Sequence, residues 1–194
     1  MPSISQTIAT LQTRGLDLTD SRLLLLHALG QPRAGRAWLL AHDTDLVSEA
    51  VNTSLQGYVA RRLAGEPVAY IVGHKECYGL NLQVNSDVLV PRPDTETLVD
   101  WALDVLEPTP DARMVDLGTG SGAIALALKA TRPALQVEAV DYSHAALAVA
   151  QANAQRLGLA VTFSQGSWLS GTEGVFDAIV SNPPYIREDD EHLP

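Results

Sequence analysis

The sequence predicts an α/β protein in which a doubly wound parallel sheet follows a small bundle of helices. Three observations lead to this fold class. Residues 1–64 show only short segments of helical periodicity, each bounded by capping residues or glycine. Residues 67–90 are richer in β-forming side chains. From residue 113 onward, short apolar segments alternate with helical ones, which is typical of strands joined by crossover helices.

Four short helices are expected in residues 1–66, which we assign to an N-terminal helical bundle. Ser3 and Ser48 are good N-caps for the first and the last of these helices. The second helix is expected to start at residues 19–20, and the third to lie near residues 34–41. No residue pattern in this bundle indicates a catalytic site.

A β-hairpin is expected next, and we assign residues 67–90 to a linker of this kind. Residues 68–72 (VAYIV) are rich in β-formers, and residues 78–84 alternate apolar and polar side chains. The remaining residues, 91–194, are assigned to the α/β domain. Asp94 is expected to cap the first helix of that domain.

The α/β domain is expected to contain four strands joined by helices and a glycine-rich turn. The expected strands are residues 114–117, 137–141, 160–163 and 176–180, and the expected crossover helices are residues 123–131 and 144–157. Because such units place every strand in the same direction, we expect the carboxyl ends of the strands to meet at one edge of the sheet.

Composition and charge limit the class of function. The 194 residues are 46% hydrophobic and 19% charged, and the single cysteine, Cys77, excludes a disulfide framework or a cysteine-built zinc site. No membrane segment or secretory signal is predicted, so we expect a cytoplasmic protein. Residues 81–194 carry sixteen acidic and six basic side chains. A surface that follows nucleic-acid phosphates is basic, so this part favours a cationic ligand or a basic protein partner, unless its acidity serves only solubility.

Residues 118–122 (GTGSG) form a turn between the first strand and its helix, where glycines let the backbone approach a ligand. With Ala123 this turn also satisfies the dinucleotide fingerprint, and Asp141 ends the second strand, where a ribose-binding acid belongs. Asp116 favours S-adenosylmethionine over NAD, because its carboxylate can pair with the amino group of a methionine moiety and would repel a pyrophosphate.

Residues 182–185 (NPPY), directly after the fourth strand, are the most specific motif of the chain. The two prolines lack N–H donors, so the Asn182 side-chain oxygen and the backbone carbonyls remain as acceptors. Acceptors of this kind suit a planar NH2 group, and Tyr185 can stack on a planar substrate. This motif therefore indicates methyl transfer to an NH2 nitrogen.

The chain resembles the HemK-type peptide chain release factor glutamine methyltransferases of bacteria. The resemblance extends over the whole chain and rests on residues 66–70 (EPVAY), 91–96 (PRPDTE), 116–122 (DLGTGSG) and 181–185 (SNPPY). It implies a Rossmann-like class I methyltransferase domain after the helical bundle. Domains of this class have seven strands, so we expect the chain to be incomplete after its fourth strand.

The resemblance also implies a reaction, in which S-adenosylmethionine methylates the side-chain amide nitrogen (N5) of the glutamine in the Gly-Gly-Gln motif of class-1 release factors. No metal is implied. The bundle, residues 1–66, would recognise the release factor, residues 91–96 would support the pocket, and the protein would be a monomer without direct nucleic-acid contacts. The residues implied to bind the cofactor are Asp116, Gly118, Thr119, Gly120, Ser121, Gly122, Asp141, Trp168 and Asn182. Those implied to bind the substrate are Asn182, Pro183, Pro184 and Tyr185, with Asn182, Pro183 and Tyr185 as the catalytic group.

Three alternatives remain. An adenine-specific nucleic-acid N6-methyltransferase uses the same Asn-Pro-Pro-Tyr motif, but the acidic residues 81–194 and the lack of a basic, aromatic recognition region disfavour it. An inactive binding fragment is the second alternative, if the chain is complete. An NAD-dependent dehydrogenase is disfavoured because no hydride-handling histidine or tyrosine–lysine pair is present.

Overall fold

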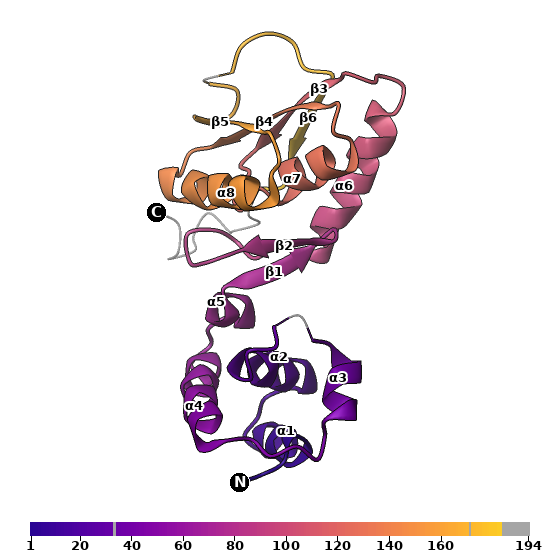
Figure 1. Ribbon diagram of the computed structural model, residues 1–194. Coiled ribbons are helices and arrows are strands. Elements are labelled where there is room, and N and C mark those ends of the chain that lie inside the picture. Colours follow the sequence, from indigo (N-terminus) through magenta and orange to yellow (C-terminus); the bar gives the residue numbers. More distant parts are fainter. Residues whose placement is uncertain (33, 171, 184–194) are drawn as a thin grey trace. The chain divides into compact units, whose positions relative to one another are not determined.

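The computed structural model describes residues 1–32, 34–170 and 172–183 (Figure 1). The chain divides into two compact units, a helical unit, Met1–Gly73, and an α/β unit that begins at His74. Within the described ranges, no helix combines the length and the apolarity that crossing a bilayer requires.

The helical unit contains five helices in its described residues. They are α1 (Ile4–Thr13), α2 (Leu18–Ala28), α3 (Arg36–Ala41), α4 (Glu49–Leu63) and α5 (Val68–Val72). Ser3 caps α1, because its hydroxyl accepts the N–H of Gln6 while the Gln6 side chain accepts the N–H of Ser3. Ser48 caps α4, so both expected caps are confirmed.

The second helix begins earlier than predicted. Its N-cap is Asp17, whose side chain accepts the N–H of Asp20 over 2.8 Å, so the predicted start at residues 19–20 is wrong. Fully buried leucines of α2 and α4, among them Leu24 and Leu55, form the core of the helical unit.

Residues 68–72 form helix α5, so their interpretation as a strand is wrong. Pro67 precedes the helix and Gly73, with φ of 79°, ends it in the left-handed region that favours glycine. Ile71 is buried in the core of the helical bundle. Burial against this core outweighs the weak β-propensity of the segment.

The hairpin lies entirely within the α/β unit. Its strands are β1 (His74–Cys77) and β2 (Leu80–Gln83), paired antiparallel. The two-residue turn places Tyr78 and Gly79 at φ of 51° and 74°, both positive, as tight hairpins require. The first helix after the hairpin holds this turn. There, Glu96 accepts the N–H of Tyr78 over 2.9 Å and Asp100 accepts its hydroxyl over 2.7 Å.

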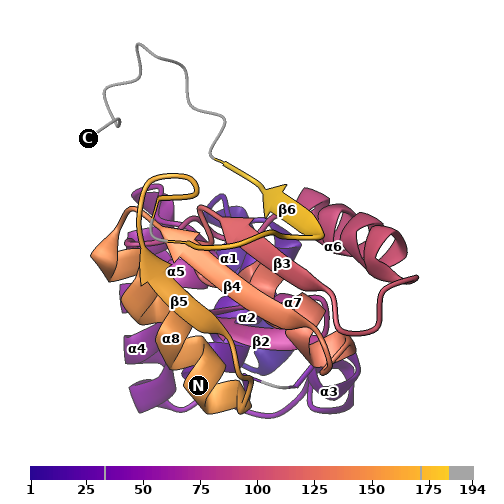
Figure 2. The same ribbon diagram turned by 90° about the horizontal axis from the view of Figure 1, so that it is seen from above.

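The parallel sheet has the strand order β5-β4-β3-β6. The elements of this part are α6 (Pro93–Leu106), β3 (Arg113–Leu117), α7 (Ala123–Thr131), β4 (Gln136–Asp141), α8 (His144–Leu157), β5 (Thr162–Gln165) and β6 (Ala178–Ser181). Figure 2 shows the four strands side by side, and Figure 1 shows α7 and α8 together on one side of them. The parallel α/β architecture is confirmed, and β5 and β6 begin two residues later than predicted.

The strand order of this sheet positions the site. The chain runs outward from β3 through β4 to β5 and then returns to β6 on the other side of β3, so the strand order reverses at β3. Ligands of open α/β sheets bind at the carboxyl ends of the strands at such a reversal.

Helix α6 begins with Pro93 after an N-cap residue, Arg92, that makes no side-chain cap bond, so the expected cap by Asp94 is wrong. Proline suits this first position because its missing N–H has no helical partner there.

Candidate cofactor and substrate site

The glycine-rich turn after β3 has the backbone conformation that its sequence predicts. Gly118, Gly120 and Gly122 have φ of 70°, 56° and 83°, a region that other residues rarely adopt. The N–H groups of Gly118 and Thr119 both donate to the carbonyl of Val140, over 2.8 and 3.0 Å. The turn is therefore fixed against the end of β4.

The side chain of Asp116, at the end of β3, supports this turn through hydrogen bonds. Its side chain is buried, with Oδ2 accepting the Thr119 hydroxyl over 2.6 Å and the N–H of Ala125 over 3.3 Å. Its Oδ1 is buried and has no hydrogen-bond partner within the described residues. Burial, only partly offset by the bond from Thr119, raises the pKa of the Asp116 carboxyl to about 6.

Asp141 holds the turn from the side. Its Oδ2 accepts the N–H of Gly120 and its Oδ1 accepts the N–H of Ser143, each over 2.9 Å. Ser143 in turn caps α8 by accepting the N–H of Ala146 over 3.2 Å. The end of β4, the glycine turn and the start of α8 thus form one hydrogen-bonded wall.

Asn182 follows the last residue of β6 and faces the same region. Ser181 pairs with Leu117 of β3, and the hydroxyl of Ser181 donates to the Leu117 carbonyl over 2.8 Å. The Nδ2 of Asn182 donates to the hydroxyl of Thr95 over 3.2 Å. The strand end and α6 therefore fix Asn182 beside the glycine turn.

A cavity of about 550 Å3 lies between these elements, in the size range of sites for small molecules. The sequence-predicted site residues that line it are Gly118, Thr119, Gly120, Ser121, Asp141, Asn182 and Pro183. Asp116 and Gly122 lie outside this lining and support the turn. Trp168 is also outside it, with 69% of its surface exposed and φ of 53°. Pro184 and Tyr185 lie outside the described residues.

Sequence reasoning missed part of the cavity wall. Residues 87–90, between the hairpin and α6, line it, as do Ser143 and Ala146 at the start of α8. Ser143 carries a usable signal, because a serine two residues after a strand end is a typical helix cap. Residues 87–90 carry none. Residues 91–96, expected to support the pocket, contribute Pro91, Arg92, Asp94 and Thr95 to the lining.

The charges of the lining fit S-adenosylmethionine. Three carboxylates and one guanidinium line the cavity within the described residues; they are Asp87, Asp94, Asp141 and Arg92. S-adenosylmethionine carries a sulfonium, an ammonium and one carboxylate, which such a surplus of acceptors suits. A dinucleotide pyrophosphate would meet mainly negative charge here. No group of histidine, cysteine or acidic residues in the described ranges is arranged to hold a metal ion.

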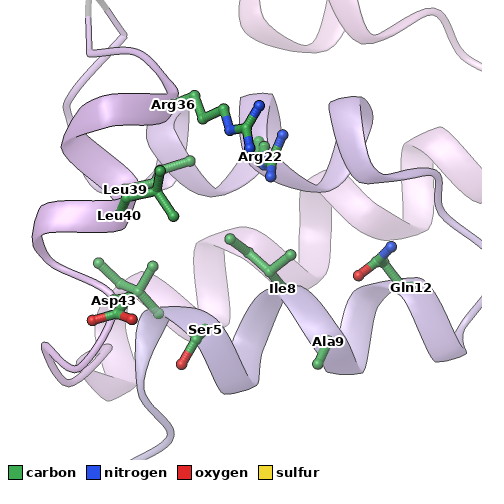
Figure 3. A pocket seen from close by; sticks show the side chains of 10 residues that line it. Ser5, Ile8, Ala9, Gln12, Arg22, Arg36, Leu39, Leu40 and Asp43 are labelled. Carbon is green, nitrogen blue, oxygen red and sulfur yellow. The ribbon is translucent and has the colours of Figure 1, made fainter.

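A smaller cavity, of about 210 Å3, lies within the helical unit (Figure 3). Ile8 and Leu39 contribute apolar surface to it, and Leu40, 60% exposed, lies at its border. Figure 3 shows the side chains of Arg22 and Arg36 on the α2 and α3 side of this cavity. Neither arginine takes part in a salt bridge within the described ranges. Asp43 also lines this cavity, so two guanidinium groups and one carboxylate border the apolar surface.

Comparisons with known proteins agree for both units. A family model described as the methyltransferase small domain matches residues 95–193, and a model described as the PrmC N-terminal domain matches residues 4–73. A release factor glutamine methyltransferase of Bordetella pertussis is 49% identical over 92% of this chain and 66% of its own length. Two from Xylella fastidiosa are each 45% identical, over 96% and 100% of this chain and 67% and 70% of their own lengths. The chain thus spans about two thirds of the length of these curated relatives.

Proposed function

The chain belongs to the release factor glutamine methyltransferase family, and from that premise we propose that it methylates class-1 peptide chain release factors with S-adenosylmethionine. The acceptor is the side-chain amide nitrogen, N5, of the glutamine in the Gly-Gly-Gln motif. The reaction takes place in the cytoplasm on a protein substrate, with the enzyme as a monomer and without direct nucleic-acid contacts.

One observation carries this proposal. The glycine turn after β3 and Asn182 after β6 line the same cavity, although about 60 residues and three strands, β4, β5 and β6, separate them in the chain. A methyl donor held on the turn and an NH2 group held by Asn182 would therefore meet in one cavity. Methyl transfer to nitrogen needs this proximity, since no residue of the enzyme has to form a covalent intermediate.

Most of the proposed cofactor contacts line the cavity, whereas Asp116, Gly122 and Trp168 lie outside the lining. Gly118, Thr119, Gly120, Ser121 and Gly122 make up the turn that cradles the methionine part. Asp141 binds the ribose hydroxyls, Asp116 acts on the methionine amino group, and Trp168 packs near the adenine. When bound, S-adenosylmethionine supplies a methyl group on a positively charged sulfur. The surplus of carboxylates over guanidinium groups in the cavity lining supports this assignment.

The acceptor amide is a weak nucleophile because its lone pair is delocalised, so positioning supplies most of the catalysis. Alignment of nitrogen, methyl carbon and sulfur is worth about 7–11 kcal/mol in favourable cases. Asn182 accepts one N–H of the substrate NH2 group, and Pro183, Pro184 and Tyr185 complete the acceptor side. The S-adenosylmethionine held by the glycine turn would supply the methyl group and leave as neutral S-adenosylhomocysteine, and the methylated nitrogen would lose one proton to water.

We assign recognition of the release factor body to the helical unit, within residues 1–66. The cavity in Figure 3 supports this, because Arg22 and Arg36 stand beside exposed Leu40. A protein segment with acidic and apolar side chains fits such a surface. The Gly-Gly-Gln loop would then enter the cavity of the α/β unit.

Methyl transfer from labelled S-adenosylmethionine to a purified class-1 release factor tests the proposal. The control is the same factor with alanine in place of the glutamine of Gly-Gly-Gln. Label on the first protein and none on the second supports both the reaction and the acceptor residue. Label on DNA or RNA, with none on the release factor, would instead favour the adenine methyltransferase alternative.

A further inference from the structure

The side chain of Asn153, on α8, is fully buried and joins two segments that are distant in the chain. Its Nδ2 donates to the carbonyl of Ser121 in the glycine turn and to the carbonyl of Gln83 at the end of β2, each over 3.0 Å. Its Oδ1 accepts the N–H of Gln83 over 2.7 Å and a second hydrogen bond, from the Arg156 guanidinium, over 3.2 Å. Both hydrogens and both acceptor sites of the amide are therefore in use.

The orientation of this amide is fixed by its backbone partners. A backbone carbonyl can only accept a hydrogen bond, and a backbone N–H can only donate one. If the amide turned over, Nδ2 would face the N–H of Gln83 and Oδ1 would face the carbonyl of Ser121, so both contacts would be lost. Asparagine has a low helix propensity, so the contacts of its side chain account for Asn153 inside α8.

Asn153 lies outside the cavity lining, but both of its main-chain partners belong to the wall of the cavity or lead into it. Ser121 lines the cavity itself. Gln83 is followed by buried Val84 and then by residues 87–90, which form another part of the lining. The two parts of the wall are therefore attached to one side chain of α8.

The contact with Ser121 also fixes a peptide group of the glycine turn. The Ser121 carbonyl and the Gly122 N–H belong to the same planar peptide. Asn153 binds this carbonyl, and the carbonyl of Thr119 accepts this N–H over 2.9 Å. Because Gly122 lacks a side chain, such contacts have to hold the peptide in place. Bound to Asn153, the Ser121 oxygen is not presented to the cavity, where it would repel the carboxylate of a methionine moiety.

We propose that Asn153 is a positioning residue for S-adenosylmethionine, whose amide fixes the glycine turn and residues 87–90 in one arrangement and thereby raises the affinity for the cofactor. The inference rests on the function proposed above and deepens its cofactor site. Asn153 has no free hydrogen-bonding group, so it acts through Ser121 and Gln83 and contacts neither cofactor nor substrate.

Calorimetric titration with S-adenosylhomocysteine tests this role in two variants. Asn153→Leu keeps the approximate size of the side chain and removes all of its hydrogen bonds, and Asn153→Ala removes them with a smaller side chain. Leu135→Ala is the control for lost stability, because Leu135 is fully buried and precedes β4, at the amino ends of the strands and away from the cavity. Urea unfolding verifies that each variant is folded under the conditions of the titration.

Both Asn153 variants are expected to bind S-adenosylhomocysteine about tenfold more weakly, the scale of one lost hydrogen bond. Leu135→Ala is expected to bind it with wild-type affinity. In methyl transfer to a release factor, the Asn153 variants are expected to raise the KM for S-adenosylmethionine about tenfold, with kcat and the KM for the release factor unchanged. A residue that only stabilised the fold would leave the affinity of the folded molecules unchanged.

Hydrogen exchange in the wild-type chain gives a second test that needs no variant. Gln83 lies outside the cavity lining, so S-adenosylhomocysteine slows exchange of its N–H only through the attached wall or through global stabilisation. The N–H of Leu159 donates to the carbonyl of Ala154 over 3.0 Å, at the other end of α8, and reports global stabilisation alone. Saturation is expected to slow exchange at Gln83 about tenfold more than at Leu159.

Each other outcome has a distinct meaning. Wild-type affinity in the folded Asn153 variants would overturn the inference and leave the proposed function standing. Equal losses of affinity in Asn153→Ala and Leu135→Ala would assign the loss to stability and also overturn it. If neither Asn153 variant folds, hydrogen exchange decides, and equal slowing at Gln83 and Leu159 would overturn the inference.

The wild-type chain separates this inference from the proposed function. A wild-type chain that binds S-adenosylhomocysteine through Asn153 but methylates no release factor would overturn the proposed function and leave the inference standing. A wild-type chain that binds no S-adenosylhomocysteine would overturn both.

Discussion

The main-chain N–H of Gly120 donates to Oδ2 of Asp141 over 2.9 Å, so the carboxylate proposed to bind ribose also holds the glycine turn. Its other oxygen accepts the N–H of Ser143. Each carboxylate oxygen accepts two hydrogen bonds, so ribose hydroxyls can bind Asp141 without releasing either backbone group. The conformation of the turn and the binding of the cofactor are therefore coupled through one side chain.

Asp141→Asn is expected to weaken binding of S-adenosylhomocysteine at least tenfold. The substitution removes the negative charge and turns one acceptor into a donor, which faces either Gly120 or Ser143. Hydrogen bonds to a charged group contribute about 1.5–3 kcal/mol, which sets the scale of the loss. Calorimetric titration measures it. Asp111→Asn, at an exposed position outside the cavity, is the matched control, and equal affinities for the two variants would refute the role of Asp141.

The glycine turn and the alternation of strands and helices could be predicted because their signals are local. Positive φ at Gly118 and Gly120 and a carboxylate at the end of a strand are features of short sequence segments. The start of α2 was misplaced because Asp17, Thr19 and Asp20 are all acceptable caps, and only packing of the helix selects among them.

Other features depend on contacts between distant segments and carry no local signal. Helix α5 has the composition of a strand, and burial of Ile71 in the helical core decides its conformation. The contact of Thr95 with Asn182 spans 87 positions, so neither residue alone indicates it. Residues 87–90 enter the cavity wall only because the hairpin and α6 fix both ends of this segment.

Asp116→Asn is expected to flatten the dependence of stability on pH. The pKa of Asp116, raised by burial from 3.8 to about 6, means that the folded protein binds this proton more tightly than the unfolded chain. Tighter binding of this proton stabilises the folded protein fully below pH 3.8, and this stabilisation is lost as pH rises through about 6. The change in the free energy of unfolding amounts to about 3 kcal/mol. Urea unfolding of both proteins between pH 4 and pH 8 measures the difference. Parallel pH profiles for the two proteins would contradict the raised pKa.

Gly122→Ala is expected to lower the free energy of unfolding by about 2–4 kcal/mol, from backbone strain and crowding together. Gly122 has φ of 83°, and a Cβ there would lie 3.0 Å from Leu126 Cδ1 and 3.3 Å from Ala150 Cβ. Gly158→Ala is the control, because Gly158 has φ of 68° with no atom within 4 Å of a new Cβ. It is expected to cost only about 1–2 kcal/mol. Chemical unfolding measures the free energy of unfolding of both variants. Equal losses in the two variants would show that crowding around Gly122 contributes nothing.

Arg22→Gln combined with Arg36→Gln is expected to raise KM for the intact release factor about tenfold, through loss of two charged contacts. Methylation of a short Gly-Gly-Gln peptide is expected to be unchanged, since the peptide has no body for the helical unit to contact. Arg14→Gln, an exposed arginine outside the cavity of Figure 3, is the control. An unchanged KM for the release factor in the double variant would remove this cavity from the recognition surface.

Glu96→Ala is expected to destabilise the α/β unit by about 1–3 kcal/mol while leaving kcat of the folded protein unchanged. Glu96 accepts the N–H of Tyr78 in the hairpin turn, whereas its neighbour Thr95 borders the cavity. These adjacent residues of α6 thus have different roles, one at the hairpin and one at the cavity, because successive side chains of a helix point in directions about 100° apart. Glu96→Gln keeps an acceptor oxygen and is expected to restore most of the stability. Chemical unfolding and methyl transfer, measured on both variants, separate the two roles, and a loss of kcat in folded Glu96→Ala would place Glu96 in the site after all.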